Sequence, residues 1–184
     1  MSIRWLAAAA AAIGVGVLVG PMLFGDRAGT PEPGQVAGRE SGAACSAKKA
    51  NLDFTLKDMH GATVKLADFK GKPILLNYWA TWCGPCKAEI PALNDLYAQY
   101  KDQGLAIVGI SVDDDEPTLL EFSKNFPMSY TVVTAREQED ALEAAGPVWG
   151  YPTTFFIGRD GSICGKHMGP ATKEDFEREI KALL

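Results

Sequence analysis

Two cysteines three positions apart, Cys83 and Cys86, are the residues of this chain best suited to carry out chemistry. They follow an apolar segment at 74–79 and precede a segment at 88–100 whose apolar residues recur at helical spacing. The pair is therefore predicted to lie where a buried strand turns into an amphipathic helix. The first turn of a helix favours a thiolate, so we expect the pKa of Cys83 to lie below the usual value of about 8.5. The predicted chemistry is the opening and closing of a Cys83–Cys86 disulfide.

Two other roles for this pair have to be weighed, half of a zinc site and an inert structural disulfide. A zinc ribbon needs a second pair of Cys or His ligands at similar spacing, and the sequence contains none. The two histidines, His60 and His167, lie far apart in sequence, although the fold could bring them together. We therefore expect a redox dithiol that needs neither a metal nor a cofactor.

A resemblance to a known family lies in the run Asn77–Pro91, which reads NYWATWCGPCKAEIP. It is similar to the active site of TlpA/ResA-type proteins, a branch of the thioredoxin superfamily that comprises membrane-tethered, extracytoplasmic thiol-disulfide oxidoreductases. The likeness covers roughly residues 50–184 and implies an α/β, thioredoxin-like fold. In that fold a central mixed sheet is flanked by helices, here with an N-terminal β-hairpin and an extra helix–strand insert at about 116–133.

The order of apolar and amphipathic segments predicts the elements that position the cysteines. After the hairpin, strands and helices alternate along the chain, which predicts a mainly parallel sheet with right-handed crossovers. A final hairpin turns at Asp160-Gly161, and Thr172 is expected to cap the last helix. The expected strands lie at 54–56, 63–66, 74–79, 105–112 and 130–134, within 148–157, and at 162–167. The expected helices lie at 83–100, 116–126, 137–145 and 172–184.

The first 49 residues are predicted to precede the folded domain. Residues 5–24 carry no charge and would span about 30 Å as a helix, enough to cross a bilayer. An uncleaved anchor over 1–24 is favoured over a cleaved signal peptide, because residues 22–26 make a poor cleavage site. Residues 25–49 are rich in Gly, Ala, Pro and Ser, which predicts a flexible linker to a domain at 50–184.

Either form of the N-terminal segment would direct the domain out of the cytoplasm. Arg4 and the amino terminus favour an N-terminus inside the cell, because positive charge marks the cytoplasmic side. We therefore expect a single-pass protein of the inner membrane with a periplasmic catalytic domain. The net charge of −5 and the lack of a Lys/Arg cluster argue against a nucleic-acid partner.

Residues around the cysteines are expected to bind the client protein. The dipeptide Tyr151-Pro152 before a strand is a weak signal by itself, and an ordinary turn proline is the alternative. The resemblance implies that Pro152 is cis, packs against the cysteines and presents the Tyr151 backbone to an extended client peptide. Trp82 is expected on a docking surface and Trp79 in the core, with ordinary core packing as the alternative for Trp82 as well. Gly84 leaves room for client backbone, and Pro85 suits the first helical turn.

Glu89 follows Cys86 by three residues and so lies on the same helix face. A carboxylate there can accept the proton of Cys86 as a mixed disulfide resolves. Exposed glutamates are common on helices, and spacing alone leaves that alternative open. The resemblance implies that Glu89 is an active-site acid.

Cys45 and Cys164 are the remaining cysteines, and the spacing argument leaves them to pair with each other. In an oxidising compartment such a bond would link the start of the domain to its last strand. The alternative is a buried Cys164 and a free Cys45 in the linker.

The expected function is reduction of client-protein disulfides, because the Gly84-Pro85 dipeptide resembles that of reductants. The resemblance implies clients such as apocytochrome c or proteins that assemble copper sites and cytochrome oxidase. It also implies re-reduction by a membrane electron donor of the CcdA/DsbD type. Three alternatives remain, a disulfide oxidant or isomerase, a peroxidase, and a copper carrier that uses Cys83, Cys86 and His167.

Overall fold

A computed structural model of the chain describes residues 40–41, 45–136 and 138–184. The predicted anchor at 1–24 and most of the predicted linker lie outside the described residues. Within the described residues, no helix has the length and apolar character needed to cross a membrane.

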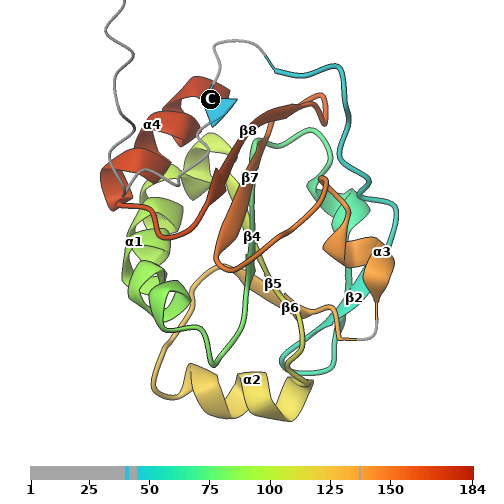
Figure 1. The fold of residues 1–184 in the computed structure, drawn as a ribbon, viewed down its shortest axis with the longest axis vertical. Helices are drawn as coiled ribbons and strands as arrows, with labels where there is room; N and C mark the ends of the chain where they lie inside the picture. The colour runs from blue at the N-terminus through green and yellow to red at the C-terminus, as the bar shows by residue number, and fades with distance from the viewer. Residues whose placement is uncertain (1–39, 42–44, 137) are drawn as a thin grey trace, which may run out of the picture. The chain divides into compact units, whose positions relative to one another are not determined.

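The centre of the fold is an eight-stranded sheet in the order β1-β8-β7-β4-β5-β6-β2-β3 (Figure 1). The strands are β1 (Glu40–Ser41), β2 (Thr55–Asp58), β3 (Thr63–Lys65), β4 (Ile74–Trp79), β5 (Ala106–Ser111), β6 (Thr131–Thr134), β7 (Thr153–Ile157) and β8 (Ile163–Met168). The α-helices are α1 (Gly84–Tyr100), α2 (Glu116–Ser123), α3 (Glu139–Leu142) and α4 (Lys173–Leu183), with 3-10 turns η1 (Leu66–Phe69) and η2 (Lys101–Gln103).

The direction of the strands corrects the expectation of a mainly parallel sheet and confirms the mixed sheet that the resemblance implies. Among the described strands, only the β4–β5 and β5–β6 pairs are parallel. The β7–β8 hairpin joins β4 in the antiparallel sense, and the β2–β3 hairpin joins β6 likewise. Strand–helix alternation predicts parallel pairing only where a helix makes the crossover between two strands. The strands at both ends of the domain are joined by hairpins, and a hairpin pairs its two strands in the antiparallel sense.

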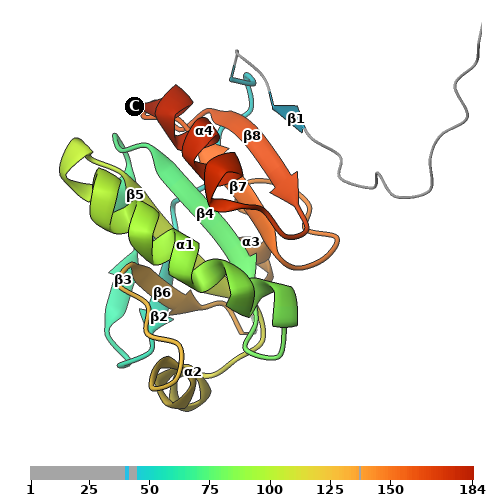
Figure 2. The same cartoon turned by 90° about the vertical axis from the view of Figure 1, so that its left-hand side faces the viewer.

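Helices cover both faces of the sheet (Figure 2). Helices α1 and α4 pack on one face, where α1 buries Ile90, Leu93 and Leu96. Helix α3 lies on the other face, and the Tyr78 hydroxyl of β4 donates a 2.9 Å hydrogen bond to the carbonyl of Ala141 there. All six residues of β4 and of β5 are buried, as the continuous apolar runs predict for strands covered on both sides.

Two helices are shorter than the sequence predicts. Helix α2 ends at Ser123 rather than at 126, and Pro127 disfavours the helical conformation in the residue before it. Helix α3 has one turn, Glu139–Leu142, and a turn at Gly146 with φ 129° follows it. The predicted cap of the last helix is confirmed, because Thr172 and Asp175 form a reciprocal capping box.

The described part of the predicted linker lies against the sheet. The Ser46 N–H donates to the carbonyl of Ile163 at 2.8 Å, and Lys49 forms an ion pair with Asp160 at 2.5 Å. Strand β1 pairs antiparallel with β8, the strand that would otherwise be the edge of the sheet. Composition indicated a free coil here, but backbone hydrogen bonds to the last hairpin hold the segment from Cys45 onward.

A disulfide joins Cys45 to Cys164, so the pairing expected from the sequence is confirmed. The bond spans 119 residues and fixes the start of the described domain to β8. Because closing a long loop removes conformational freedom from the unfolded chain, the bond stabilises the fold without contributing to the active site.

Replacing Cys45 and Cys164 together by Ser should lower the free energy of unfolding by about 4–5 kcal/mol, the loop-closure value for a bond of this span. Denaturant unfolding measures the change. Replacing Cys83 and Cys86 together is the matched control, since that bond spans only three residues and should stabilise the fold less. A Cys45/Cys164 double variant as stable as the unsubstituted protein would contradict this account.

Candidate active site

The disulfide between Cys83 and Cys86 lies at the junction of β4 and α1. Cys83 is the N-cap of α1, and its Sγ accepts a 3.2 Å hydrogen bond from the Cys86 N–H. Both side chains are buried in the described chain, and Pro85 occupies the first turn as expected. In the reduced state, the N–H groups of this turn and the helix dipole would favour a thiolate on Cys83.

The loop before β7 lies beside the cysteine turn. The Tyr151–Pro152 peptide bond is cis, as the resemblance implies. The rings of Trp82 and Tyr151 meet edge to face with centroids 6.0 Å apart. Trp82 is 62% exposed, which agrees with a docking surface, whereas Trp79 is buried in the core. The predicted client-binding residues Trp82, Gly84, Pro85, Tyr151 and Pro152 therefore share one end of the sheet.

Glu89 is buried rather than exposed on its helix. Its side chain is 3% exposed, and its Oε1 accepts a 2.7 Å hydrogen bond from the Ala171 N–H. Its Oε2 has no hydrogen-bond partner among the described residues. Burial raises the pKa of Glu89 to about 7, and the Ala171 N–H opposes part of this shift. A carboxyl group with this pKa can both accept and donate a proton near neutral pH.

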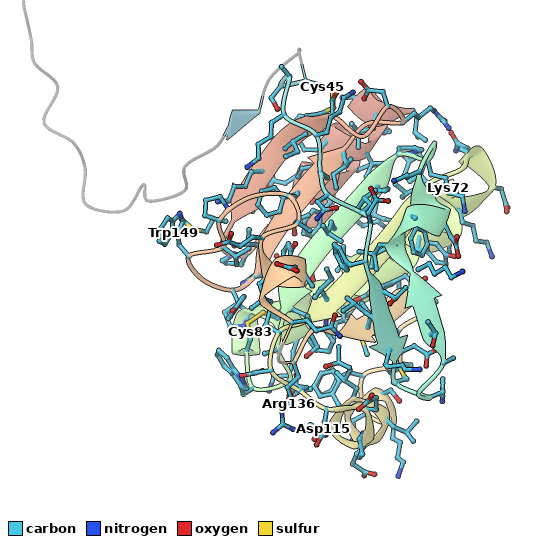
Figure 3. The ribbon with its side chains drawn as sticks, turned by 90° about the vertical axis from the view of Figure 1, so that its right-hand side faces the viewer. Cys45, Lys72, Cys83, Asp115, Arg136 and Trp149 are labelled. Atoms are coloured by element: carbon cyan, nitrogen blue, oxygen red, sulfur yellow. A yellow bond between two sulfur atoms is a disulfide. The ribbon has the colours of Figure 1, made fainter. Side chains whose placement is uncertain are left out.

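Three consecutive aspartates after β5 were not singled out by the sequence interpretation. Asp113 accepts from the Trp82 Nε1–H at 2.8 Å, and Asp114 accepts from the Thr81 N–H at 2.8 Å. Asp115 caps α2 and forms an ion pair with Arg136 at 3.2 Å. Figure 3 shows Asp115 and Arg136 at the same end of the sheet as Cys83. Their place directly after a predicted parallel strand could have identified them as candidate site residues, because binding sites form at the carboxyl ends of parallel strands.

A groove of about 570 Å³ adjoins the cis-proline loop. Trp149 lines it and is 79% exposed, and the acidic side chains of Asp140 and Glu143 lie along it. Tyr151 belongs both to this groove and to the ring contact with Trp82. The groove therefore presents an exposed aromatic ring and two acidic side chains next to the cis-proline loop.

Metal binding has no support in the geometry of the described residues. No group of three or more His, Cys, Asp or Glu side chains lies close enough there to hold a metal ion. His167 lies in β8, where its Nε2 is 3.2 Å from the carbonyl oxygen of Pro170.

A dithiol at a helix N-terminus, a cis-proline beside it and a mixed sheet between helices define the class of thioredoxin-like thiol-disulfide oxidoreductases. A family model described as the AhpC/TSA family matches residues 47–165, and the chain belongs to this family. The thiol-disulfide oxidoreductase ResA of Geobacillus kaustophilus is 38% identical over 133 residues, which are 71% of this chain and 74% of that protein. ResA of Bacillus thuringiensis subsp. konkukian is 34% identical over 131 residues, 71% of this chain and 75% of that protein.

Solved structures agree with this class. A thiol:disulfide interchange protein of the thioredoxin family from Chlorobium tepidum is 31% identical and superposes with a TM-score of 0.67. The match covers 76% of this chain and 99% of that one. The predicted fold and enzyme class, a thiol-disulfide oxidoreductase acting on disulfide-bearing substrates, are thereby confirmed.

The pKa of Glu89 makes a prediction for the pH dependence of turnover. The rate of disulfide reduction should rise with pH through a step at about pH 7, because only the ionised carboxylate can accept the Cys86 proton. Glu89→Gln should remove this step while retaining the hydrogen bond from the Ala171 N–H. Steady-state rates with a protein disulfide between pH 5 and 9 measure it, and Glu177→Gln on α4 is the control. A Glu89→Gln profile that keeps the same step would refute the assignment.

Proposed function

We propose that this protein reduces disulfides of client proteins outside the cytoplasm, with Cys83 as nucleophile, Cys86 as resolving cysteine and Glu89 as proton acceptor. The observation that carries the proposal is the buried Glu89 carboxyl one helical turn after Cys86, with its pKa near 7. An acid of this kind is suited to removing a proton from a shielded thiol at neutral pH.

The reaction balances in two exchanges. The Cys83 thiolate attacks one sulfur of the client disulfide, a mixed disulfide forms, and the other client sulfur leaves and takes up a proton. Cys86 then gives its proton to Glu89 and attacks the Cys83 sulfur, and the second client sulfur leaves as a thiolate that takes up a proton from water. The client gains two electrons and two protons in all, and the enzyme is left with the Cys83–Cys86 disulfide.

The client and the compartment belong to the same proposal. An uncharged segment at 5–24 supports a single-pass anchor in the inner membrane with the catalytic domain in the periplasm. Apocytochrome c or proteins that assemble copper sites and cytochrome oxidase are the proposed clients. A membrane donor of the CcdA/DsbD type would return the two electrons, because cytosolic reductants do not reach that compartment.

The reduction potential of the Cys83–Cys86 pair tests the direction of the reaction. A reductant should have a value nearer to the about −270 mV of thioredoxin than to the about −120 mV of the oxidant DsbA. Equilibration of the full chain with glutathione buffers at pH 7 gives the value. A potential close to that of DsbA would support the oxidant alternative and overturn the proposal.

Trp149 should contribute to client binding and not to the chemistry of the cysteines. Cys86→Ser should retain the client as a mixed disulfide on Cys83, and adding Trp149→Ala should lower the yield of trapped protein several-fold. The rate with a small disulfide such as oxidised glutathione should not change. Leu184→Ala, which removes an exposed apolar side chain at the end of the chain, is the matched control. Equal trapping by Trp149→Ala and Leu184→Ala would count against the groove as a client site.

A further inference from the structure

Asp114 is a buried carboxylate that is hydrogen-bonded to the loop before Cys83. It lies between β5 and α2, and its side chain is almost fully enclosed. Its Oδ2 accepts from the Thr81 N–H at 2.8 Å and from the Ser111 hydroxyl at 2.6 Å. Its Oδ1 accepts from the Thr81 hydroxyl at 2.6 Å. Two of these three hydrogen bonds come from Thr81, which precedes the nucleophilic cysteine by only two residues.

The position of Asp114 is itself fixed from the neighbouring strand. The Thr134 hydroxyl at the end of β6 donates a hydrogen bond to the backbone carbonyl of Asp114. Ser111 ends β5 and Thr81 follows β4, so the Asp114 carboxylate links the ends of β4 and β5, and its backbone carbonyl adds the link to β6. A side chain tied at so many points cannot swing away from the loop without breaking several buried hydrogen bonds.

The charge of Asp114 is not neutralised by a cation. Its three side-chain donors are one backbone N–H and two hydroxyl groups, all neutral. Among the residues that the structure describes, no Lys, Arg or His forms an ion pair with it. The nearby Arg136 pairs with Asp115 instead. Because the group is enclosed, water screens its field less than it screens that of an exposed carboxylate.

We propose that Asp114 is a positioning residue that holds the loop before Cys83 through Thr81 and, by its buried negative charge, makes the cysteine pair more reducing. A negative charge disfavours a second one nearby, so Asp114 opposes the formation of the Cys83 thiolate. The N-terminus of α1 acts in the opposite sense and favours that thiolate. The balance between these two influences sets the ionisation of the reduced site.

This balance determines the reduction potential. Reduction of the disulfide takes two electrons and breaks the bond between Cys83 and Cys86, and the sulfurs take up protons according to their pKa values. A protein whose thiolate is stabilised holds its reduced form more strongly and becomes the better oxidant, as in DsbA. By disfavouring the thiolate, Asp114 stabilises the oxidised form and favours electron donation to a client. The inference rests on the thiol-disulfide exchange class and not on the proposed compartment or client.

Asp114→Asn isolates the charge from the hydrogen bonds. The Asn carbonyl oxygen can accept from the Thr81 N–H and the Ser111 hydroxyl, and its NH₂ can donate to the Thr81 hydroxyl. The variant should become the stronger oxidant: its equilibrium constant for oxidising a dithiol should rise about tenfold, which corresponds to a reduction potential higher by about 30 mV. The pKa of Cys83, followed by thiolate absorbance in the reduced full chain, should fall by about one unit, a tenfold change in its ionisation constant.

Three further variants keep the test decisive. Asp113→Asn removes an exposed charge one residue away and should shift the potential less than Asp114→Asn does. Ser111→Ala removes one hydrogen bond but leaves the charge, so the potential should not rise. If Asp114→Asn does not fold, Asp114→Ser provides a smaller neutral side chain that leaves room for water beside Thr81. The other charged or titratable groups around the site, to be kept unchanged, are Lys87, Glu89, Asp115, Arg136 and Tyr151.

The outcomes separate this inference from the proposed function. A rise in potential and a fall in the Cys83 pKa on Asp114→Asn alone support the role of the charge. An unchanged potential, or an equal rise on Ser111→Ala, overturns it. A strongly oxidising potential of the unsubstituted protein would refute the proposed direction of reaction and would leave the Asp114 comparison intact.

Discussion

The junction of β4 and α1 is the constraint on which the rest of the structure depends. Cys83 must be the N-cap of α1 to use the free N–H groups of its first turn, and this fixes where the helix begins. The strand before it pairs with β5 along its whole length and with β7 from Ile74 to Tyr78, so the junction cannot move independently of the sheet. The reactive cysteines are therefore positioned by the most deeply buried part of the fold.

Strand direction brings the other parts of the site to this junction. Strand β5 runs parallel to β4, so the aspartates that follow β5 lie beside the end of β4. Strand β7 runs antiparallel to β4 and pairs Thr153 with Tyr78, so its beginning, with Pro152 just before it, lies there too. A fully parallel sheet would place the start of β7 at the far end. The mixed sheet is thus a requirement of the site.

The sequence predicted the features that residue type and spacing determine, but not those that depend on contacts between residues far apart in the chain. The cysteine spacing, the buried strands, the Thr172 cap and the pairing of Cys45 with Cys164 follow from residue types and spacing, and the structure confirms them. The burial of Glu89 could not be read from its helix, because the loop that carries Ala171 covers it. The role of Asp114 was missed for the same reason, since its partner Thr81 is 33 residues away in sequence. The cis bond at Pro152 was expected only through the family resemblance.

The two disulfides lie at different ends of the domain, and one forms the reactive site while the other fixes the N-terminal segment to β8. Figure 3 shows Cys45 and Cys83 at opposite ends of the sheet. The Cys45–Cys164 bond and the Lys49–Asp160 ion pair fix residues 45–49 near the turn between β7 and β8, remote from the cysteine turn, and β1 pairs with the middle of β8 at Gly165 and Lys166. These contacts hold the start of the described domain against β8 and the turn before it, and none of them involves the cysteine turn. Thiol-disulfide exchange at Cys83 can therefore proceed without disturbing the bonds that hold the N-terminal part of the domain in place.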